Sequence, residues 1–193
     1  MNKLVIRTAL ITVAILAFSA LAVFSLWILC SPQTMASACE RTGNYPFAVT
    51  CADLRYKYTK NVGDLARCAE DGILSGKDGL IVRYGGLLIA DKDFDSLCAK
   101  KDEALKDGQY GGYTADYKSY ICGHLSAAQY RKGDFSEALK SAEFGDSYNK
   151  LVLEIVTGGT KAEAGKVLEK LEGSGNSLIP LLNNFINNTG DAK

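Results

Sequence analysis

Apolar residues are distributed in two different ways along this chain. Residues 8–31 carry no charged side chain and are mostly apolar. A helix needs roughly 20 apolar residues to cross a bilayer, so this run is long enough. After residue 31, apolar side chains recur every three to four residues, which is the spacing of one face of a helix. The pattern therefore predicts one transmembrane helix followed by a series of amphipathic helices.

The charges on either side of the apolar run predict its orientation. Lys3 and Arg7 precede the run, and the next charged residue, Glu40, lies well beyond its end. Positive charge at the N-terminal flank is typical of a segment whose N-terminus stays in the cytoplasm. We therefore expect a short cytoplasmic segment at 1–7, a single-pass signal anchor at 8–31, and a C-terminal domain outside the cell membrane. The short basic segment has a bacterial character.

Two other fates of the N-terminal segment are open at this point. A cleaved signal peptide has an apolar stretch of about 7–15 residues and a small-residue cleavage site, for which Ala36-Ser37-Ala38 is a candidate. The apolar run is longer than that, which favours an uncleaved anchor. Lipid attachment at Cys30 or Cys39 is a minor alternative, because the residue before Cys30 is large and Cys39 lies late after the run.

Glycine-rich turns divide the rest of the chain into short helical segments, and few stretches show the two-residue alternation of a strand. The segment 106–116 is the longest irregular piece, either a plain loop or an insertion that carries a binding surface. The helices are expected at about 32–42, 45–59, 62–75, 78–91, 93–106, 114–132, 135–146, 148–157, 160–172 and 177–188. Gly85 and Gly86 fall inside one of them and predict a bend or a close helix crossing.

A similar motif occurs twice in the chain, as RTGNYPFAVTCA at 41–52 and as RKGDFSEALKSA at 131–142. In the second copy, Gly133 ends one helix in a conformation that glycine adopts readily. Asp134 follows as the expected cap of the next helix, and Glu137 completes a variant capping box. The motif therefore predicts a tight turn between two helices.

Small residues on both sides of this turn allow the two helices to approach closely. Ala138 and Ala142 lie one turn apart on the second helix, and Ser126 offers a matching small surface on the first. With Gly133, Asp134 and Phe135 at the turn, residues 119–146 resemble the tetratricopeptide (TPR) repeat. The resemblance departs from the family at Cys122, where a Trp-like residue is usual, and no proline follows the second helix.

The resemblance implies an all-α fold, a right-handed α-solenoid of degenerate TPR-like helical hairpins over 32–188, with a frayed tail at 189–193. Gly43 and Gly76 are separated by close to one TPR unit of about 34 residues, whereas the other spacings are irregular. Cutting after Ala38 would then remove half of the first hairpin. The positions expected to pack between helices are Ala36, Ala48, Ala52, Ala69, Ser126, Gly133, Ala138 and Ala142.

Composition narrows the classes of partner. Lys plus Arg and Asp plus Glu each number 22, and without Lys3 and Arg7 the exported part has 20 basic against 22 acidic residues. Because no basic stripe is present, we do not expect a nucleic-acid partner. The six cysteines form no CxxC motif and no metal-ligand spacing, so no metal or cofactor is expected. Whether the five cysteines after Cys30 pair in disulfides or are buried thiols is open.

No motif for catalysis stands out, so we expect no catalytic residues and no enzyme. The single histidine, His124, lies on a predicted helix without a nucleophile or carboxylate pointed to by the sequence, which favours a structural role. Acidic pairs such as Glu70-Asp71 are able to perform acid–base chemistry only when they share a cleft. Their simpler interpretation is a solvated helix face.

Tyrosine is the most unusual feature of the exported part. Tyr113, Tyr117 and Tyr120 share one helix face by their spacing, and aromatic side chains with a hydroxyl are common at binding surfaces. They are the candidate partner-binding residues, with core packing as the alternative. The favoured function is a membrane-tethered scaffold or assembly subunit that binds a protein or peptide partner. A ligand-binding or sensor domain using the Tyr-rich 110–130 region is the alternative, and an enzyme is less favoured.

Overall fold

The computed structural model describes residues 3–105, 116–174 and 176–188, and every regular element within these ranges is an α-helix. The side chains of residues 3–5, 29, 147 and 188 are not described. The helices are α1 (Lys3–Cys30), α2 (Pro32–Arg41), α3 (Tyr45–Thr59), α4 (Val62–Leu74), α5 (Asp78–Ile89), α6 (Phe94–Ala104), α7 (Tyr117–Arg131), α8 (Phe135–Gly145), α9 (Ser147–Gly158), α10 (Lys161–Leu171) and α11 (Ile179–Asn188).

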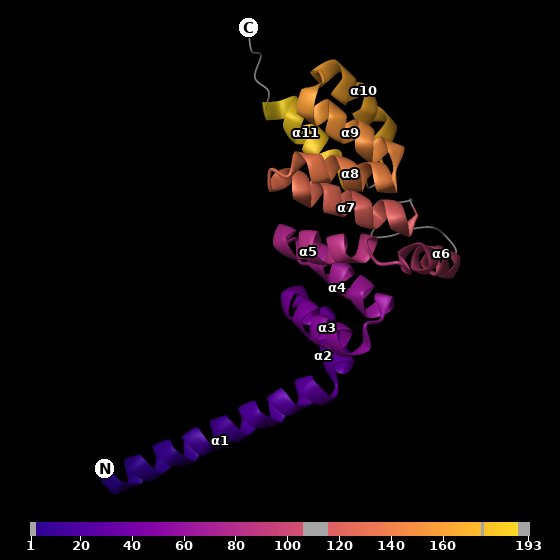
Figure 1. Ribbon diagram of the computed structural model, residues 1–193. Helices are drawn as coiled ribbons and strands as arrows, with labels where there is room; N and C mark the ends of the chain where they lie inside the picture. The colour runs from indigo at the N-terminus through magenta and orange to yellow at the C-terminus, as the bar shows by residue number, and fades with distance from the viewer. Residues whose placement is uncertain (1–2, 106–115, 175, 189–193) are drawn as a thin grey trace.

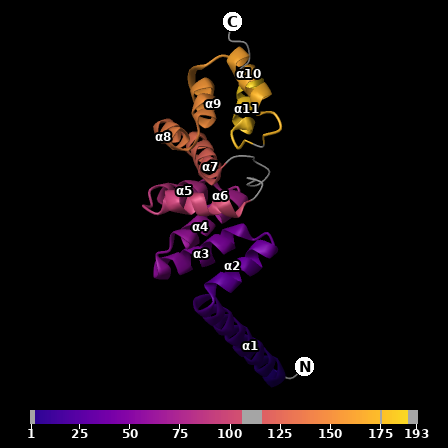
Figure 2. The ribbon, with the colours of Figure 1, turned by 90° about the vertical axis from the view of Figure 1, so that its right-hand side faces the viewer.

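The helices after α1 stack on one another in chain order, and α1 projects from the base of the stack as a single rod (Figure 1). Successive helices pack on one another, α2 on α3, α3 on α4, α4 on α5 and α7 on α8. Helix α5 packs directly on α7, while α6 lies to one side and contacts α4 and α7. In the view turned by 90°, the two chain ends again lie at opposite ends of an elongated molecule (Figure 2).

Helix α1 is long and apolar enough to cross a membrane by length and composition, over Ile6–Ile28. None of that span is buried against the rest of the protein. Its C-terminal end touches the stack, where the Phe24 ring lies on the Phe47 ring with the centroids 6.5 Å apart. The apolar run predicted from the sequence is therefore one helix with a solvent- or lipid-facing surface.

The buried apolar residues form three clusters along the stack. The first joins α2 to α3 through Met35, Ala36, Cys39, Ala48 and Cys51. The second spans α3 to α7 and the third α7 to α11. Seven of the eight small residues that the sequence placed between helices are at most 2% exposed, and they are Ala36, Ala48, Ala52, Ala69, Ser126, Ala138 and Ala142. Gly133 is exposed, because it lies in the turn and not between the helices.

The repeated motif forms the same turn in both copies. Gly43 and Gly133 have positive φ values of +71° and +86°, a region that favours glycine. The following residues, Asn44 and Asp134, have nearly identical backbone angles of −86°, 61° and −87°, 61°. The sequence identity between the two copies is therefore explained by one shared helix–turn–helix geometry.

The predicted capping box at Asp134 is wrong. The Asp134 side chain makes no cap hydrogen bond, because its ψ of 61° lies outside the extended region in which the side chains of N-cap residues reach the first free amides. Thr160 has an extended backbone, with ψ 157°, and forms a full capping box with Glu163 at the start of α10. The tight glycine turn therefore replaces the side-chain cap rather than adding to it.

Helix boundaries lie within about three residues of the predicted ones, the largest difference being the start of α7 at Tyr117. Helix α5 runs without a break through Gly85, which lies against Leu125 of α7. A Cβ on Gly85 would stand 3.4 Å from Leu125 Cδ1, so the glycine marks a close helix crossing and not a bend. Most of the irregular segment, residues 106–115, falls outside the described residues.

Candidate functional site

The tyrosines chosen from the sequence belong to the core. Tyr117 is 0% exposed and Tyr120 is 9% exposed, and both pack in the cluster between α4, α6 and α7. Tyr113 lies outside the described residues. The spacing argument places Tyr117 and Tyr120 on one helix side, but that side faces the protein interior and offers no binding surface. These two residues take the packing role that was the alternative.

His124 is half-buried on the same helix, and its ring meets the Tyr120 ring edge to face with the centroids 4.9 Å apart. Burial, with a smaller contribution from the positive charge of Arg131, lowers the pKa of His124 to about 4. The imidazole is therefore neutral at pH 7 and packs as an aromatic side chain.

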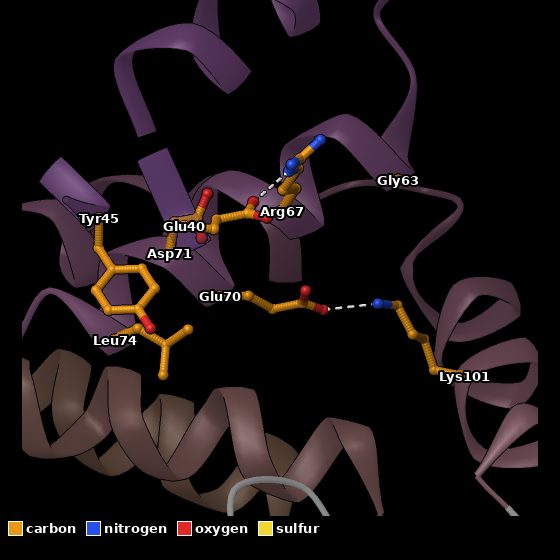
Figure 3. Close-up of a pocket in the computed structure, with 8 residues that line it drawn as sticks. All are labelled: Glu40, Tyr45, Gly63, Arg67, Glu70, Asp71, Leu74 and Lys101. Atoms are coloured by element: carbon orange, nitrogen blue, oxygen red, sulfur yellow. Dashed lines mark hydrogen bonds and ion pairs between the residues drawn. The ribbon is translucent and has the colours of Figure 1, made fainter. Parts of the chain in front are cut away.

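A polar pocket lies where residues of α2, α4 and α6 meet (Figure 3). Its volume is about 470 Å³. The lining residues come from four helices and are Glu40, Tyr45, Gly63, Arg67, Glu70, Asp71, Leu74 and Lys101. We call this recess the α2–α4–α6 pocket.

Helix α4 supplies most of this lining because of its sequence spacing. Arg67, Glu70, Asp71 and Leu74 follow one another at intervals of one, three or four residues, which places them on one side of the helix. Asn61 caps the helix start by accepting a hydrogen bond from the Gly63 amide at 2.7 Å. The pocket floor is therefore built on a rigid, capped helix.

Arg67 links α4 to α2. Its Nε donates to Glu40 Oε1 at 2.6 Å, and its Nη2 donates to Ser37 Oγ at 2.7 Å. Both charged side chains are partly shielded from water, so this ion pair is stronger than a fully exposed pair. These two contacts hold the guanidinium against α2.

Glu70 links α4 to α6 and α7. Lys101 Nζ lies 2.8 Å from Glu70 Oε1, and the buried Tyr117 hydroxyl donates to the same oxygen at 2.7 Å. The Lys101 ammonium also stands over the Tyr117 ring, 5.3 Å from its centroid. A carboxylate with two donors of this kind is held in one position.

Asp71 is the unusual member of the pocket. Its side chain is only 3% exposed, and its Oδ2 atom has no hydrogen-bond partner. Burial, and next the negative charge of Glu40, raise the pKa of Asp71 to about 7, with Arg67 acting in the opposite direction. A hydrogen bond from the protonated Asp71 carboxyl to Glu40 raises it further, so the atom without a partner belongs to the ionised form. Asp71 therefore exchanges its proton near neutral pH.

The sequence interpretation of Glu70-Asp71 as a solvated pair is wrong for Asp71. The buried residues of α4 include Leu65, Cys68, Ala69 and Gly72, and Asp71 follows Cys68 by three residues. It therefore lies within the apolar stripe of the helix. That position was the one available signal that this carboxyl is buried.

A second recess of about 420 Å³ lies between α5 and α8. It contains Gln129, whose Oε1 is buried without a hydrogen-bond partner, beside Ser141 and the exposed Phe144 ring. Its two charged residues, Glu137 and Lys140, pair with each other at 2.7 Å. This recess has no buried ionisable group, so the α2–α4–α6 pocket is the stronger candidate site.

Within the described ranges, no group of three or more His, Cys, Asp or Glu side chains is arranged to hold a metal ion. The pocket chemistry is instead that of hydrogen bonding, ion pairing and proton exchange. Comparisons of this chain with protein-family models, with curated proteins and with solved structures found no match. Its function is therefore argued from the fold and from the α2–α4–α6 pocket.

Proposed function

We propose that this chain is a membrane-tethered scaffold, a right-handed TPR-like α-solenoid that binds a protein or peptide partner at the outer face of the cell membrane. Three observations support the proposal. A long apolar helix precedes a stack of helical pairs. The two copies of the repeated motif form turns of the same geometry. The stack carries a polar pocket lined by residues of α2, α3, α4 and α6.

The α2–α4–α6 pocket is the single observation that carries partner binding. Most of its polar groups hold the helices together, but Asp71, which lines the recess, has a buried Oδ2 atom without a hydrogen-bond partner. Leu74 at the edge of the pocket is 56% exposed, which leaves apolar surface for a contact. A recess with an apolar edge and one unsatisfied polar group is typical of a recognition site.

The same recess supports a second function, a sensor domain for a small ligand. Its volume of about 470 Å³ falls in the range of roughly 300–1,000 Å³ usual for ligand pockets. The sensor hypothesis then uses this pocket and not the Tyr-rich region, because Tyr117 and Tyr120 are buried. A partner retained by the intact membrane favours the scaffold, whereas a released small molecule favours the sensor.

Site-specific photocrosslinking in intact membranes tests the scaffold. A photoreactive amino acid replaces Leu74 at the pocket edge, and a second chain carries it at Tyr58, which is 74% exposed and does not line the pocket. We expect a discrete crosslinked protein from position 74 and not from position 58, identified by mass spectrometry. Identical products at both positions, or none at position 74, would contradict partner binding at this pocket.

A further inference from the structure

We propose that the α2–α4–α6 pocket receives a basic side chain of the partner, a lysine ammonium or an arginine guanidinium, which donates hydrogen bonds to Asp71. This inference rests on the proposed function and names the chemistry that the pocket selects. It is argued from the unused hydrogen-bonding capacity of the pocket, its charge, its apolar wall and its exchangeable proton.

One buried atom of the pocket, Asp71 Oδ2, has no hydrogen-bond partner, and it is an acceptor when the carboxyl is ionised. Glu40 accepts from Arg67, and Glu70 accepts from Lys101 and Tyr117. Asp71 Oδ2 remains buried without a partner, although buried polar atoms are nearly always hydrogen-bonded in proteins. A ligand that completes the pocket must therefore supply donors, as ammonium and guanidinium groups do.

The charge of the lining also favours a cation. Three carboxyl groups line the pocket, at Glu40, Glu70 and Asp71, against two cations at Arg67 and Lys101. Both cations are already paired with a carboxylate, and an anionic ligand would approach the excess negative charge of the lining at a cost. A cationic ligand instead balances the lining charge.

The rest of the lining suits the stem of a basic side chain. Tyr45 and Leu74 lie on the side of the pocket away from Lys101 (Figure 3). Lysine and arginine pack their methylene stems against such apolar surface while the charged end reaches polar groups. The pocket therefore offers an apolar wall for the stem and a carboxyl group for the charged end.

Binding of a cation is linked to release of a proton, because Asp71 is half protonated near pH 7. The fraction of Asp71 that is ionised rises about tenfold between pH 6 and pH 8, so the affinity for a cation rises by about the same factor. The charged groups that shift the pKa of Asp71 are Glu40 from α2 and Arg67 and Glu70 from α4. The other titratable groups near Asp71 are Cys39 from α2, Tyr45 from α3 and Lys101 from α6.

The test uses the full-length chain in detergent micelles, labelled with ¹⁵N, and three small probes. N-acetyl-lysine N-methylamide and its arginine counterpart carry the cation, and the norleucine counterpart has a similar stem without charge. We expect the two basic probes to shift the amide signals of pocket residues, with about tenfold weaker binding at pH 6 than at pH 8. The norleucine probe leaves these signals unchanged.

Two variants on the same helix assign the effect. Asp71→Asn removes the charge and the proton exchange, and we expect it to lose both the binding of the basic probes and its pH dependence. Asp64→Asn is the control, because Asp64 lies on α4, pairs with Arg55 and does not line the pocket. The melting temperature of each variant shows that the stack is folded, so loss of binding in a folded Asp71→Asn chain supports the inference.

The inference is overturned when the norleucine probe binds as well as the lysine probe, when Asp71→Asn binds normally, or when no probe shifts the pocket signals. Crosslinking from position 74 separates this from the proposed function. A crosslinked partner that persists in Asp71→Asn membranes leaves the scaffold standing and removes the basic contact. Probe binding without any crosslinked partner leaves the cation site and removes the scaffold.

Discussion

The hydroxyl of Tyr117 donates a hydrogen bond to Oε1 of Glu70 across 47 residues of sequence, at a distance of 2.7 Å. The bond joins α7 to α4 and therefore couples the two blocks of helices on either side of the irregular segment. Glu70 also pairs with Lys101 of α6, so one carboxylate of α4 contacts two other helices. The neighbouring pocket is held in shape by this junction.

Replacement of Tyr117 by Phe keeps the buried ring and removes the hydroxyl. Hydrogen bonds to charged groups contribute about 1.5–3 kcal/mol, so we expect a loss of stability of that order in denaturant unfolding. Tyr130→Phe is the control, because the Tyr130 hydroxyl donates to a neutral acceptor, the Val156 carbonyl, at 3.3 Å. Equal losses in both variants would show that the Glu70 contact adds nothing beyond an ordinary hydrogen bond.

Two helical glycines predict opposite effects of the same substitution. A Cβ on Gly145 would overlap Cys122 Cβ, so Gly145→Ala is expected to destabilise the protein by about 1–3 kcal/mol through overpacking. Gly165 on α10 has no atom within 4 Å of that position, and Gly165→Ala is expected to stabilise it by about 0.5–1 kcal/mol. Thermal unfolding of both variants measures the difference in sign.

Helix caps provide a second matched pair. Thr160→Ala removes the capping box of α10 and is expected to cost about 1 kcal/mol. Asp134→Ala removes a side chain that makes no cap hydrogen bond, so in about 1 M salt, where helix-dipole effects are screened, we expect little change. Denaturant unfolding at that salt concentration compares them. A loss at Asp134 as large as that at Thr160 would mean that the Asp134 carboxylate caps α8 in solution.

The stability of the protein is expected to fall as the pH rises from about 4 to 7. The pKa of Asp71 is about 7 in the folded chain and near its ordinary value of 3.8 when unfolded, so the folded state binds the extra proton between these values. This favourable contribution is fully present below the unfolded pKa and is lost as the pH passes the folded pKa. Asp71→Asn removes the slope and is expected to be about 1–3 kcal/mol more stable than the wild type at pH 8. Parallel pH profiles of the two chains would contradict the buried carboxyl.

Thiol labelling tests the burial of the cysteines and the side of the membrane on which the stack lies. Five cysteines are buried free thiols, and only Cys30 is exposed among the six. Burial raises the pKa of Cys68, Cys98 and Cys122 to about 12, so little reactive thiolate is present at neutral pH. In a Cys30→Ser chain, we expect no labelling until the protein is denatured.

Introduction of a cysteine at Tyr58 in the Cys30→Ser background gives the topology readout. Tyr58 is 74% exposed on α3, so a membrane-impermeant maleimide added to intact cells should label it when the stack is outside. Labelling only after the cells are broken would place the stack on the inner side and remove the proposed orientation.

The sequence predicted most of the helices because their signals are local. Gly43 and Gly133 lie at turns with positive φ, a conformation that the glycine itself favours. The face that a helix buries is not a local property. Tyr117 and Tyr120 share one side of α7 by spacing, but only the packing of α4 and α6 decides that this side is the interior.

The α2–α4–α6 pocket was not predicted, because its residues come from four helices that are separate in sequence. Glu40 and Lys101 line the same recess because both pair with residues of α4, Glu40 with Arg67 and Lys101 with Glu70. Asp71 was misinterpreted because an acidic pair is usually solvated, and its neighbour Glu70 is indeed partly exposed. The predicted cap at Asp134 was wrong for a related reason, because the residue type alone does not determine the backbone angle ψ.

The shortness of α2 has a consequence for encounter with a partner. Pro32–Arg41 is 10 residues long, so at 1.5 Å per residue Glu40 stands at most about 15 Å from the end of α1. With α1 in the bilayer, the Glu40 side of the pocket lies close to the lipid headgroups. A partner anchored in the same bilayer reaches the pocket by lateral diffusion, at a high effective concentration. An intrinsic affinity of about 1 mM is then enough for the partner to occupy the pocket.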